Sequence, residues 1–258
     1  MDLFSDLRGK TAIVTGGNQG IGFALSDGLA KYGATVVIVN RRAEEGGKAA
    51  QRIRDAGGSA ISIPADVSQK DAVVKMVAKV IDQQGQIDVL VNNAGVNIRK
   101  PATEISEEDL NAILDINLKG LFFCCQAAAA PMIEQGRGKI INVSSIAYTC
   151  AFLDRTPYSA TKAGVSQLTR TLALEWAKFG LTVNAIGPGI VQTPLTEAYM
   201  KSDPQRTDRV REMIPLGRFS RPEDLVGVTL FLASKASDYL TGQTIIVDGG
   251  FTLGNMDW

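Results

Sequence analysis

Short runs of β-branched and apolar residues alternate with segments of helical length, and this alternation constrains the fold more than any other feature of the chain. Most of the short runs are almost entirely apolar, as expected for parallel strands covered on both faces. Seven strands are predicted, at Thr11–Thr15, Thr35–Asn40, Ala60–Pro64, Asp88–Asn92, Lys139–Ser144, Thr182–Ile186 and Thr244–Val247. Helices are predicted between them, at Gly20–Tyr32, Glu44–Ala56, Asp71–Gln84, Glu107–Gln135 and Tyr158–Phe179. The pattern predicts an α/β fold with a three-layer, doubly wound parallel sheet, which binds ligands at the carboxyl ends of its strands.

The size and charge of the chain favour a single soluble domain. Its 258 residues allow one sizeable core, and no linker, charge block or repeat divides them, so we predict one domain over residues 1–258. Basic and acidic residues number 27 each, which argues against nucleic acid as a partner. The first residues show no secretory pattern, and the longest apolar run, Leu121–Pro131, is short for a membrane span. We expect a cytoplasmic protein without membrane contact.

The chain contains no histidine, and this absence excludes much of the usual catalytic chemistry. Ser-His-Asp triads, Cys-His pairs and zinc sites built on histidine cannot form. The three cysteines, Cys124, Cys125 and Cys150, form no CxxC pair, and we expect no metal site. Proton transfer near neutral pH must therefore use tyrosine, lysine, cysteine or a carboxylate with a shifted pKa.

A glycine-rich turn, Thr15–Gly22, joins the first predicted strand to the first predicted helix. Gly16 would permit a tight turn, Gly20 would let a pyrophosphate approach backbone N–H groups, and Gly22 would allow close helix–strand packing, as in Rossmann-type dinucleotide-binding folds. The alternative is a glycine-rich turn without a ligand. Its position after the first strand favours a nucleotide. The turn residues predicted to contact the cofactor are Gly16, Asn18, Gln19, Gly20 and Ile21.

The end of the second predicted strand indicates which dinucleotide is bound. One neutral and two basic residues stand there, at Asn40, Arg41 and Arg42. An NAD(H) site places a carboxylate at this point to bind the ribose hydroxyls, whereas a guanidinium can pair with the 2′-phosphate of NADP(H). NADP(H) is therefore the predicted cofactor, with NAD(H) as the lesser alternative. Two observations weaken the argument: Glu44 and Glu45 could neutralise the arginines, and Gln19 stands where some NADP enzymes carry a basic residue.

Tyr158 and Lys162 lie four residues apart in a predicted helix and therefore share one face. A free tyrosine has a pKa of about 10, and a nearby ammonium favours its ionised form. Such a pair alone is usually a surface contact. Ser145, at the end of a predicted strand, adds a hydroxyl at the same edge of the sheet. Asn117, a polar residue among apolar neighbours, would hold a catalytic water or act as a structural amide between helix and strand.

Several motifs, in this order and spacing, resemble the short-chain dehydrogenase/reductase family from about residue 9 to residue 250. They are TGxxxGxG at Thr15–Gly22, Asp66 after the third strand, NNAG at Asn92–Gly95, Asn117, Ser145, YxxxK at Tyr158–Lys162, and Pro188-Gly189 with Thr193. The resemblance implies an oxidoreductase that transfers hydride between a nicotinamide and a carbonyl or secondary alcohol.

The resemblance also implies the catalytic roles. Tyr158 would exchange the proton with the substrate oxygen, and Ser145 would hydrogen-bond the same oxygen. Lys162 would hold the nicotinamide ribose and lower the pKa of Tyr158, and Asn117 would fix a water in a proton relay to Lys162. The cofactor side chains and backbone groups that it implies lie at Asp66, Val67, Asn93, Ala94, Gly95, Pro188, Gly189, Ile190 and Thr193. Asn40 departs from the family pattern, which puts the use of NAD(H) in doubt rather than the chemistry.

Substrate contacts are expected from the residues before Tyr158 and from a lid over residues 194–216. Pro194–Met200 is predicted to be a short helix, followed by a mobile polar segment at Lys201–Arg206. Arg99, Lys100 and Arg155 could attract an anionic substrate or be ordinary rim residues. The chain resembles gluconate 5-dehydrogenase-like members of the family, and a keto sugar acid is the predicted substrate.

Two alternatives for the function stay open. One is a broad-range ketone or 3-oxoacyl reductase. The other, of a different class, is a catalytically idle regulator that senses NADP, although such a protein is expected to lose Tyr158 or Lys162. The resemblance further implies a homotetramer, which would pair the apolar helices over residues 121–130 and 158–179.

Overall fold

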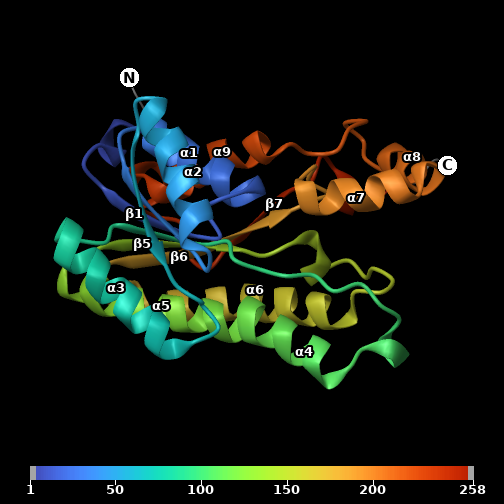
Figure 1. Cartoon of the computed structure of the whole chain (residues 1–258), viewed down its shortest axis with the longest axis horizontal. Helices are drawn as coiled ribbons and strands as arrows, with labels where there is room; N and C mark the ends of the chain where they lie inside the picture. Colours follow the sequence, from blue (N-terminus) through green and yellow to red (C-terminus); the bar gives the residue numbers. More distant parts are fainter. Residues whose placement is uncertain (1–3, 255–258) are drawn as a thin grey trace.

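The computed structural model describes residues 4–254, and its centre is a parallel sheet of seven strands in the order β3-β2-β1-β4-β5-β6-β7 (Figure 1). The strands are β1 Thr11–Thr15, β2 Thr35–Asn40, β3 Ser59–Pro64, β4 Val89–Asn92, β5 Gly138–Val143, β6 Leu181–Pro188 and β7 Thr244–Val247. All seven predicted strands are confirmed, with ends shifted by two residues at most. Because the strand order reverses between β1 and β4, a crevice opens at their carboxyl ends.

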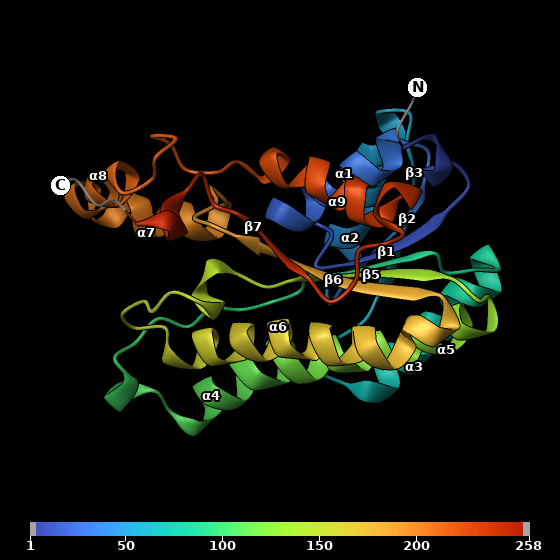
Figure 2. The same cartoon turned by 180° about the vertical axis from the view of Figure 1, so that it is seen from behind.

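Helices cover both faces of the sheet, and the two views show three layers (Figures 1 and 2). One face carries α1 Gly20–Lys31, α2 Ala43–Asp55 and α9 Val226–Ala233, and the other carries α3 Lys70–Gln84, α4 Glu107–Leu114, α5 Leu121–Glu134 and α6 Thr156–Trp176. Along β1, Ile13 packs in the core under α3, α5 and α6, whereas Ala12 and Val14 pack in the core under α1, α2 and α9. This alternation explains why β1 is apolar on both sides and confirms the predicted doubly wound fold.

The helix predicted over Glu107–Gln135 is divided by a π-helical turn, Asp115–Gly120, between α4 and α5. Helix α4 begins where the sequence predicts, because Ser106 is its N-cap and the Ser106 hydroxyl accepts a hydrogen bond from the Asp109 N–H at 3.1 Å. The combined stretch Glu107–Glu134 is long and apolar enough to cross a membrane, whereas the run Leu121–Pro131 considered in the sequence is too short. Its apolar side chains pack against the sheet, so it forms part of the core of this fold.

Two short helices follow β6 and lie beyond the carboxyl edge of the sheet, α7 Pro194–Ser202 and α8 Pro204–Glu212 (Figure 2). The first is as predicted, but the polar segment expected to be mobile at Lys201–Arg206 is largely helical. The reason is local, since Asp203 caps α8 by accepting the Arg206 N–H at 3.0 Å and Pro204 occupies its first turn. Single-turn 3₁₀ helices lie at Ser5–Leu7, Ala102–Glu104, Ile146–Tyr148, Ala177–Phe179, Pro222–Leu225, Lys235–Ser237 and Phe251–Leu253.

A buried set of amides joins two central strands to α6 just beneath the crevice. The Asn92 amide donates to Asn142 Oδ1 at 2.9 Å and to Cys125 Sγ at 3.1 Å. The Asn142 amide donates in turn to Thr169 Oγ1 at 2.9 Å. Because these groups are almost fully buried, each bond satisfies a polar atom that water cannot reach. The network therefore fixes the spacing of β4, β5 and α6.

We predict that Asn142→Ala lowers the free energy of unfolding by about 3 kcal/mol, because it leaves the Asn92 and Thr169 side chains without their buried partner. Urea unfolding followed by circular dichroism measures the change. Asn111→Ala, on the exposed face of α4, is the matched control and should change stability by about 0.5 kcal/mol or less. Equal losses in the two variants would contradict a structural role for the network.

Candidate active site

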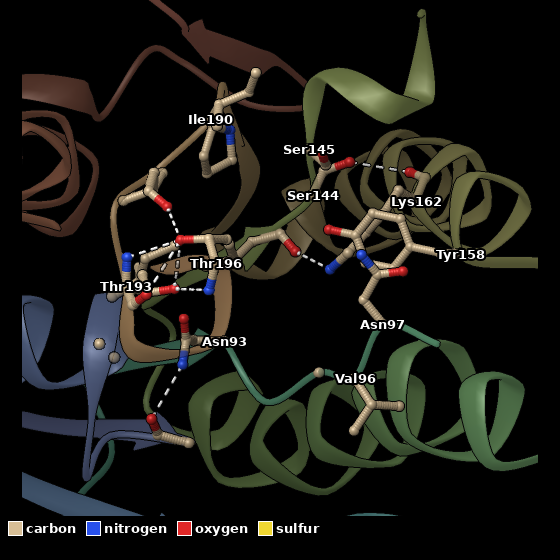
Figure 3. A pocket seen from close by; sticks show the side chains of 18 of the residues that line it. Asn93, Val96, Asn97, Ser144, Ser145, Tyr158, Lys162, Ile190, Thr193 and Thr196 are labelled. Carbon is tan, nitrogen blue, oxygen red and sulfur yellow. Dashed lines mark hydrogen bonds between the residues drawn. The ribbon is translucent and has the colours of Figure 1, made fainter. Parts of the chain in front are cut away.

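A cavity of about 290 Å³ opens at the carboxyl ends of β1, β4, β5 and β6 (Figure 3). Four parts of the chain line it: the glycine-rich turn, the segment after β4, the end of β5 with the start of α6, and the segment after β6. The predicted site residues at its wall are Gly16, Asn18, Gln19, Gly20, Ile21, Asn93, Ala94, Gly95, Ser145, Tyr158, Lys162, Pro188, Gly189, Ile190 and Thr193. Motifs that were found separately in the sequence thus lie together at one site.

The glycine-rich turn forms one end of the cavity. Gly16 and Gly20 have φ angles of 64° and 52°, a left-handed conformation that favours glycine. A Cβ atom on Gly22 would lie 2.1 Å from the carbonyl oxygen of Gly16, so α1 can start this close to the turn only with glycine here. The side chain of Gln19 does not cap α1, which leaves the first N–H groups of the helix for another acceptor. The turn therefore fits the pyrophosphate of a dinucleotide.

Asn93 holds this turn to the segment after β4. Its amide donates to the carbonyl oxygens of Thr15 at 3.0 Å and Gly16 at 3.1 Å. The hydroxyl of Thr15 accepts the N–H groups of Asn93 at 3.0 Å and Ala94 at 3.1 Å. The family resemblance implied that Asn93 contacts the cofactor, but its amide nitrogen is engaged by the turn. Its contribution is to fix the cavity wall (Figure 3).

The segment after β6 forms the opposite wall. Thr193 is the N-cap of α7, and its hydroxyl accepts the Thr196 N–H at 3.3 Å. Thr196 returns the contact by accepting the Thr193 N–H at 2.9 Å and donating to the Val191 carbonyl at 2.6 Å. Sequence analysis did not single out Thr196, although two threonines three residues apart before a helix resemble a capping box. This reciprocal pair fixes the wall that carries Pro188 and Ile190.

Tyr158 and Ser145 lie close together at the wall of the cavity, across from Thr193 and Thr196 (Figure 3). Ser145 lies two residues after the end of β5, and its hydroxyl accepts the Ala147 N–H at 3.1 Å, which orients the side chain. Burial raises the pKa of Tyr158, while a hydrogen bond with Ser145 and the positive charges of Arg155 and Arg99 offset part of this rise. The sequence predicted a lowered pKa caused by Lys162. That direction is wrong for this structure, because burial of the phenol outweighs the nearby charges.

Lys162 lies one turn after Tyr158, as predicted, with its Nζ 5.5 Å from the centre of the tyrosine ring. The ammonium donates to the Val143 carbonyl oxygen at 2.8 Å. The side chain is buried, and burial lowers its pKa to about 8. Ser144, which the sequence analysis missed, donates to the Lys162 carbonyl at 3.0 Å and so joins β5 to α6. Lys162 therefore has a fixed position and a pKa near the working range of an acid/base pair.

Asn117 lies in the π-helical turn behind the cavity rather than at its wall. Its side chain accepts the Val96 N–H at 2.8 Å and donates to the Val96 carbonyl at 2.9 Å. The amide nitrogen also lies 3.3 Å from Thr161 Oγ1. These contacts are those of a structural amide that joins the helix to the segment after β4, one of the two roles predicted from the sequence. Its place in a proton relay stays a prediction.

Five residues predicted to contact the cofactor lie outside this cavity, at or after the carboxyl ends of β2 and β3. They are Asn40, Arg41, Arg42, Asp66 and Val67. The Asn40 amide donates to the Arg42 carbonyl at 2.7 Å, and Asp66 accepts the N–H and hydroxyl of Ser68 at 3.0 and 2.7 Å. Both side chains are thus used in local turns.

The two arginines after β2 differ in their surroundings. Arg42 pairs with Glu45 at 2.8 Å, and Glu45 also accepts the Asn18 amide at 3.2 Å. From the sequence, Glu44 or Glu45 could neutralise the arginines, and Glu45 does so for Arg42. Arg41 is exposed and has no carboxylate partner within residues 4–254, so its guanidinium can donate hydrogen bonds to a phosphate.

A second, outer chamber of about 410 Å³ adjoins the first and lies under α7 and α8. Its wall is largely apolar, with Ala151, Phe152, Met200, Val210, Met213, Phe219 and Phe251. Arg99 and Arg155 line both chambers and therefore stand at the boundary between them. Phe251, close to the end of the described chain, was missed because no local pattern shows that the C-terminal segment returns to the site.

The fold and the site together define an oxidoreductase that binds a dinucleotide at the switch point of a parallel sheet. A family model described as enoyl-(acyl carrier protein) reductase matches residues 16–252, and the chain belongs to the short-chain dehydrogenase/reductase family. The predicted family is confirmed.

Three comparisons illustrate the similarity. The chain is 41% identical over 252 residues to gluconate 5-dehydrogenase of Gluconobacter oxydans, with 98% of both chains covered. It is 38% identical over 247 residues to a 3-oxoacyl-[acyl-carrier-protein] reductase of Thermotoga maritima, with 96% of this chain and 99% of the other covered. A crystal structure of a gluconate 5-dehydrogenase from Burkholderia cenocepacia, in complex with NADP and tartrate, matches with a TM-score of 0.93 at 38% identity, covering 97% of this chain and 98% of that one.

We predict that Lys162→Met stabilises the folded chain at pH 7, by up to about 3 kcal/mol, because burial disfavours the ammonium enough to lower its pKa from 10.5 to about 8. Loss of the bond to Val143 reduces this gain. Below pH 8 the folded wild type holds the buried charge and the difference is complete. Between pH 8 and pH 10.5 the folded lysine loses its proton first, so the difference shrinks.

Urea unfolding at pH 7 and pH 10 measures this dependence. Lys75→Met, on the exposed face of α3, is the control and should show little change at either pH. A stability difference for Lys162→Met that is the same at both pH values would contradict the prediction.

Proposed function

We propose that the chain is an NADP(H)-dependent oxidoreductase that interconverts the keto and hydroxyl groups of a sugar acid. The observation that carries the proposal is the placement of two guanidinium groups beside the Tyr158–Ser145 pair. Arg99 and Arg155 line the same cavity, and their charges act on the Tyr158 phenol. A hydroxyl pair can hold a carbonyl oxygen, while guanidinium groups can hold the carboxylate of the same molecule.

The chain's own residues supply orientation and one proton. NADP(H), when bound, supplies or accepts the hydride. In the reductive direction Ser145 holds the carbonyl oxygen and Tyr158 gives it the phenolic proton, and in the oxidative direction Tyr158 takes that proton back. Lys162 holds the nicotinamide ribose hydroxyls, and its ammonium favours the phenolate after the proton has left. The glycine-rich turn binds the pyrophosphate, and the Pro188–Thr193 wall holds the carboxamide.

The preference for NADP(H) is supported by Arg41 and by the relative from Burkholderia cenocepacia, whose structure contains NADP. Arg41 has no acidic partner among the described residues and lies after β2, where the 2′-phosphate would be bound. Asn40 carries no charge to repel that phosphate. Asp66 and Val67 would meet the adenine at the neighbouring strand end.

The outer chamber favours a second candidate function, reduction of a bulky ketone or a 3-oxoacyl group. Much of its wall is apolar, and an acyl or ring system could bury apolar surface against Phe152, Met213 and Phe219. The relative from Thermotoga maritima belongs to this branch. The inner chamber and its arginines favour the sugar acid, and the outer chamber favours the bulkier substrate.

We further propose that the chain acts as one domain, with residues 194–216 as a lid over the outer chamber. Helices α7 and α8 cover this chamber, and Met200 and Val210 line it from above. Closure of such a segment would exclude water during the hydride step.

Assembly into a cytoplasmic homotetramer is also proposed. Leu174 on α6 and Tyr239 before β7 are exposed apolar side chains, which a neighbouring copy could cover. Cys124, Cys125 and Cys150 are free thiols, as is usual in a reducing compartment.

Tyr158→Phe is expected to reduce kcat by about a thousandfold, because the ring is retained while the transferable proton is lost. The Kd for NADPH, measured by fluorescence titration, should stay within about twofold of wild type. Tyr32→Phe, far from the cavity, serves as the control. Retained turnover would refute the role of Tyr158, and NADPH binding without turnover in the wild type would favour an idle sensor.

The substrate proposal predicts that NADPH oxidation is faster with 5-keto-D-gluconate than with the neutral keto sugar D-fructose. Arg155→Ala should raise KM for 5-keto-D-gluconate about tenfold or more, as expected for loss of a charge-assisted bond, and leave KM for D-fructose nearly unchanged. Initial rates at saturating NADPH measure both. Equal turnover of the two sugars by wild type and variant would refute the proposal.

A further inference from the structure

Three side chains from separate parts of the chain are stacked at the boundary between the two chambers. The guanidinium carbon of Arg155 lies 5.1 Å from the centre of the Phe152 ring. The Phe152 ring is stacked on Phe251, with ring centres 6.1 Å apart and planes inclined by 20°. The rings of Phe152 and Phe251 line the outer chamber, and Arg155 lines both chambers. Phe251 is therefore joined to Arg155 through one ring.

The turn that presents Phe251 is held by Asp248. The carboxylate accepts the N–H of Gly250 at 2.9 Å and the N–H of Thr252 at 2.8 Å. The Asp248 carbonyl accepts the Phe251 N–H at 3.3 Å. Gly250 has a φ of 91°, which a residue with a side chain rarely adopts. Phe251 thus extends from a fixed turn rather than from a loose end of the chain.

The opposite end of the stack is fixed by the loop before α6. Asp154 has a φ of 61°, and among residues 4–254 it is the one residue other than glycine with a positive φ. Its carbonyl oxygen accepts the Lys100 N–H at 3.2 Å, which places Arg99 beside Arg155. These contacts fix the backbone near Arg155. The Arg155 side chain has several rotatable bonds, so it needs a packing surface to hold it in one conformation. The Phe152 ring provides that surface.

We infer that Phe251 is a positioning residue for anionic substrates, because it supports Phe152 and thereby holds the Arg155 guanidinium over the inner chamber. The inference rests on the proposed function and adds a determinant of specificity to it. A guanidinium stacked on a ring presents its N–H groups in the plane of the group, where a carboxylate can bind. The C-terminal turn would then select the charge of the substrate without touching the reacting carbonyl.

The test compares Phe251→Leu with the wild type for two substrates, 5-keto-D-gluconate and D-fructose. Loss of the ring should raise KM for 5-keto-D-gluconate about fivefold, the size of one stacked ring–ring contact, and leave kcat unchanged. KM values for D-fructose and NADPH should stay within about twofold. Leu253→Ala, an exposed position in the same turn, is the control and should change none of these values.

Two further measurements separate positioning from a general structural effect. Phe251→Tyr keeps the ring and should restore the wild-type KM. The pH profile of kcat/KM for D-fructose should move to higher pH in Phe251→Leu, in the same direction as in Arg155→Gln, because the Arg155 charge lowers the pKa of Tyr158.

Each outcome decides a separate point. Equal losses for both substrates in Phe251→Leu, or no loss for either, would overturn the inference while the charge preference of the wild type still supports the proposed function. A wild type that does not prefer 5-keto-D-gluconate to D-fructose would overturn the proposed function itself and remove the basis of the inference.

Discussion

The whole site depends on the contact between Thr15 and Asn93, at the point where the chain order in the sheet reverses. Neighbouring strands send their following segments in opposite directions there, so the sheet opens into a crevice. Reciprocal hydrogen bonds between these two residues close one end of the opening. The Asn93 amide also holds the carbonyl of Gly16, and Gly22 in the first turn of α1 lies too close to this carbonyl to carry a side chain. That one contact fixes the position of the glycine-rich turn, and the sheet sets the distance from the turn to Tyr158.

A chain without histidine must perform proton transfer with groups whose ordinary pKa lies far from neutrality. Burial affects the two candidates in opposite directions, raising the pKa of Tyr158 and lowering that of Lys162, because it disfavours the charged form of each. Burial by itself would therefore make Tyr158 a weaker acid than free tyrosine. Arg99 and Arg155 oppose the effect on the phenol. The cations proposed to bind substrate thus also adjust the acid, so that charge recognition and proton transfer share the same two side chains.

Much of this arrangement could be predicted from the sequence, and the reasons are local. Both faces of the central strands are buried, so their residues read as apolar runs, and the strand ends were found within two residues. The Tyr158–Lys162 pair follows from helical spacing alone.

What could not be predicted depends on contacts between distant segments. Nothing in the sequence shows that Glu45 pairs with Arg42 rather than with Arg41. Asn117 was recognised as a buried amide, but its partner Val96 is defined only by packing. The return of Phe251 to the site is a property of the tertiary fold. The direction of the Tyr158 pKa likewise depends on how deeply the fold buries the phenol.

The backbone of the substrate side shows where the fold accepts local cost for function. A left-handed conformation at a residue with a side chain is unfavourable by about 1 kcal/mol or more, yet Asp154 adopts it next to the active site. The bond from Lys100 to its carbonyl holds this conformation and sets Arg99 next to Arg155. Two like charges placed side by side repel each other, and an anion between them relieves that repulsion. The strained turn therefore sets Arg99 and Arg155 in one cavity with the hydroxyl groups that would receive a carbonyl.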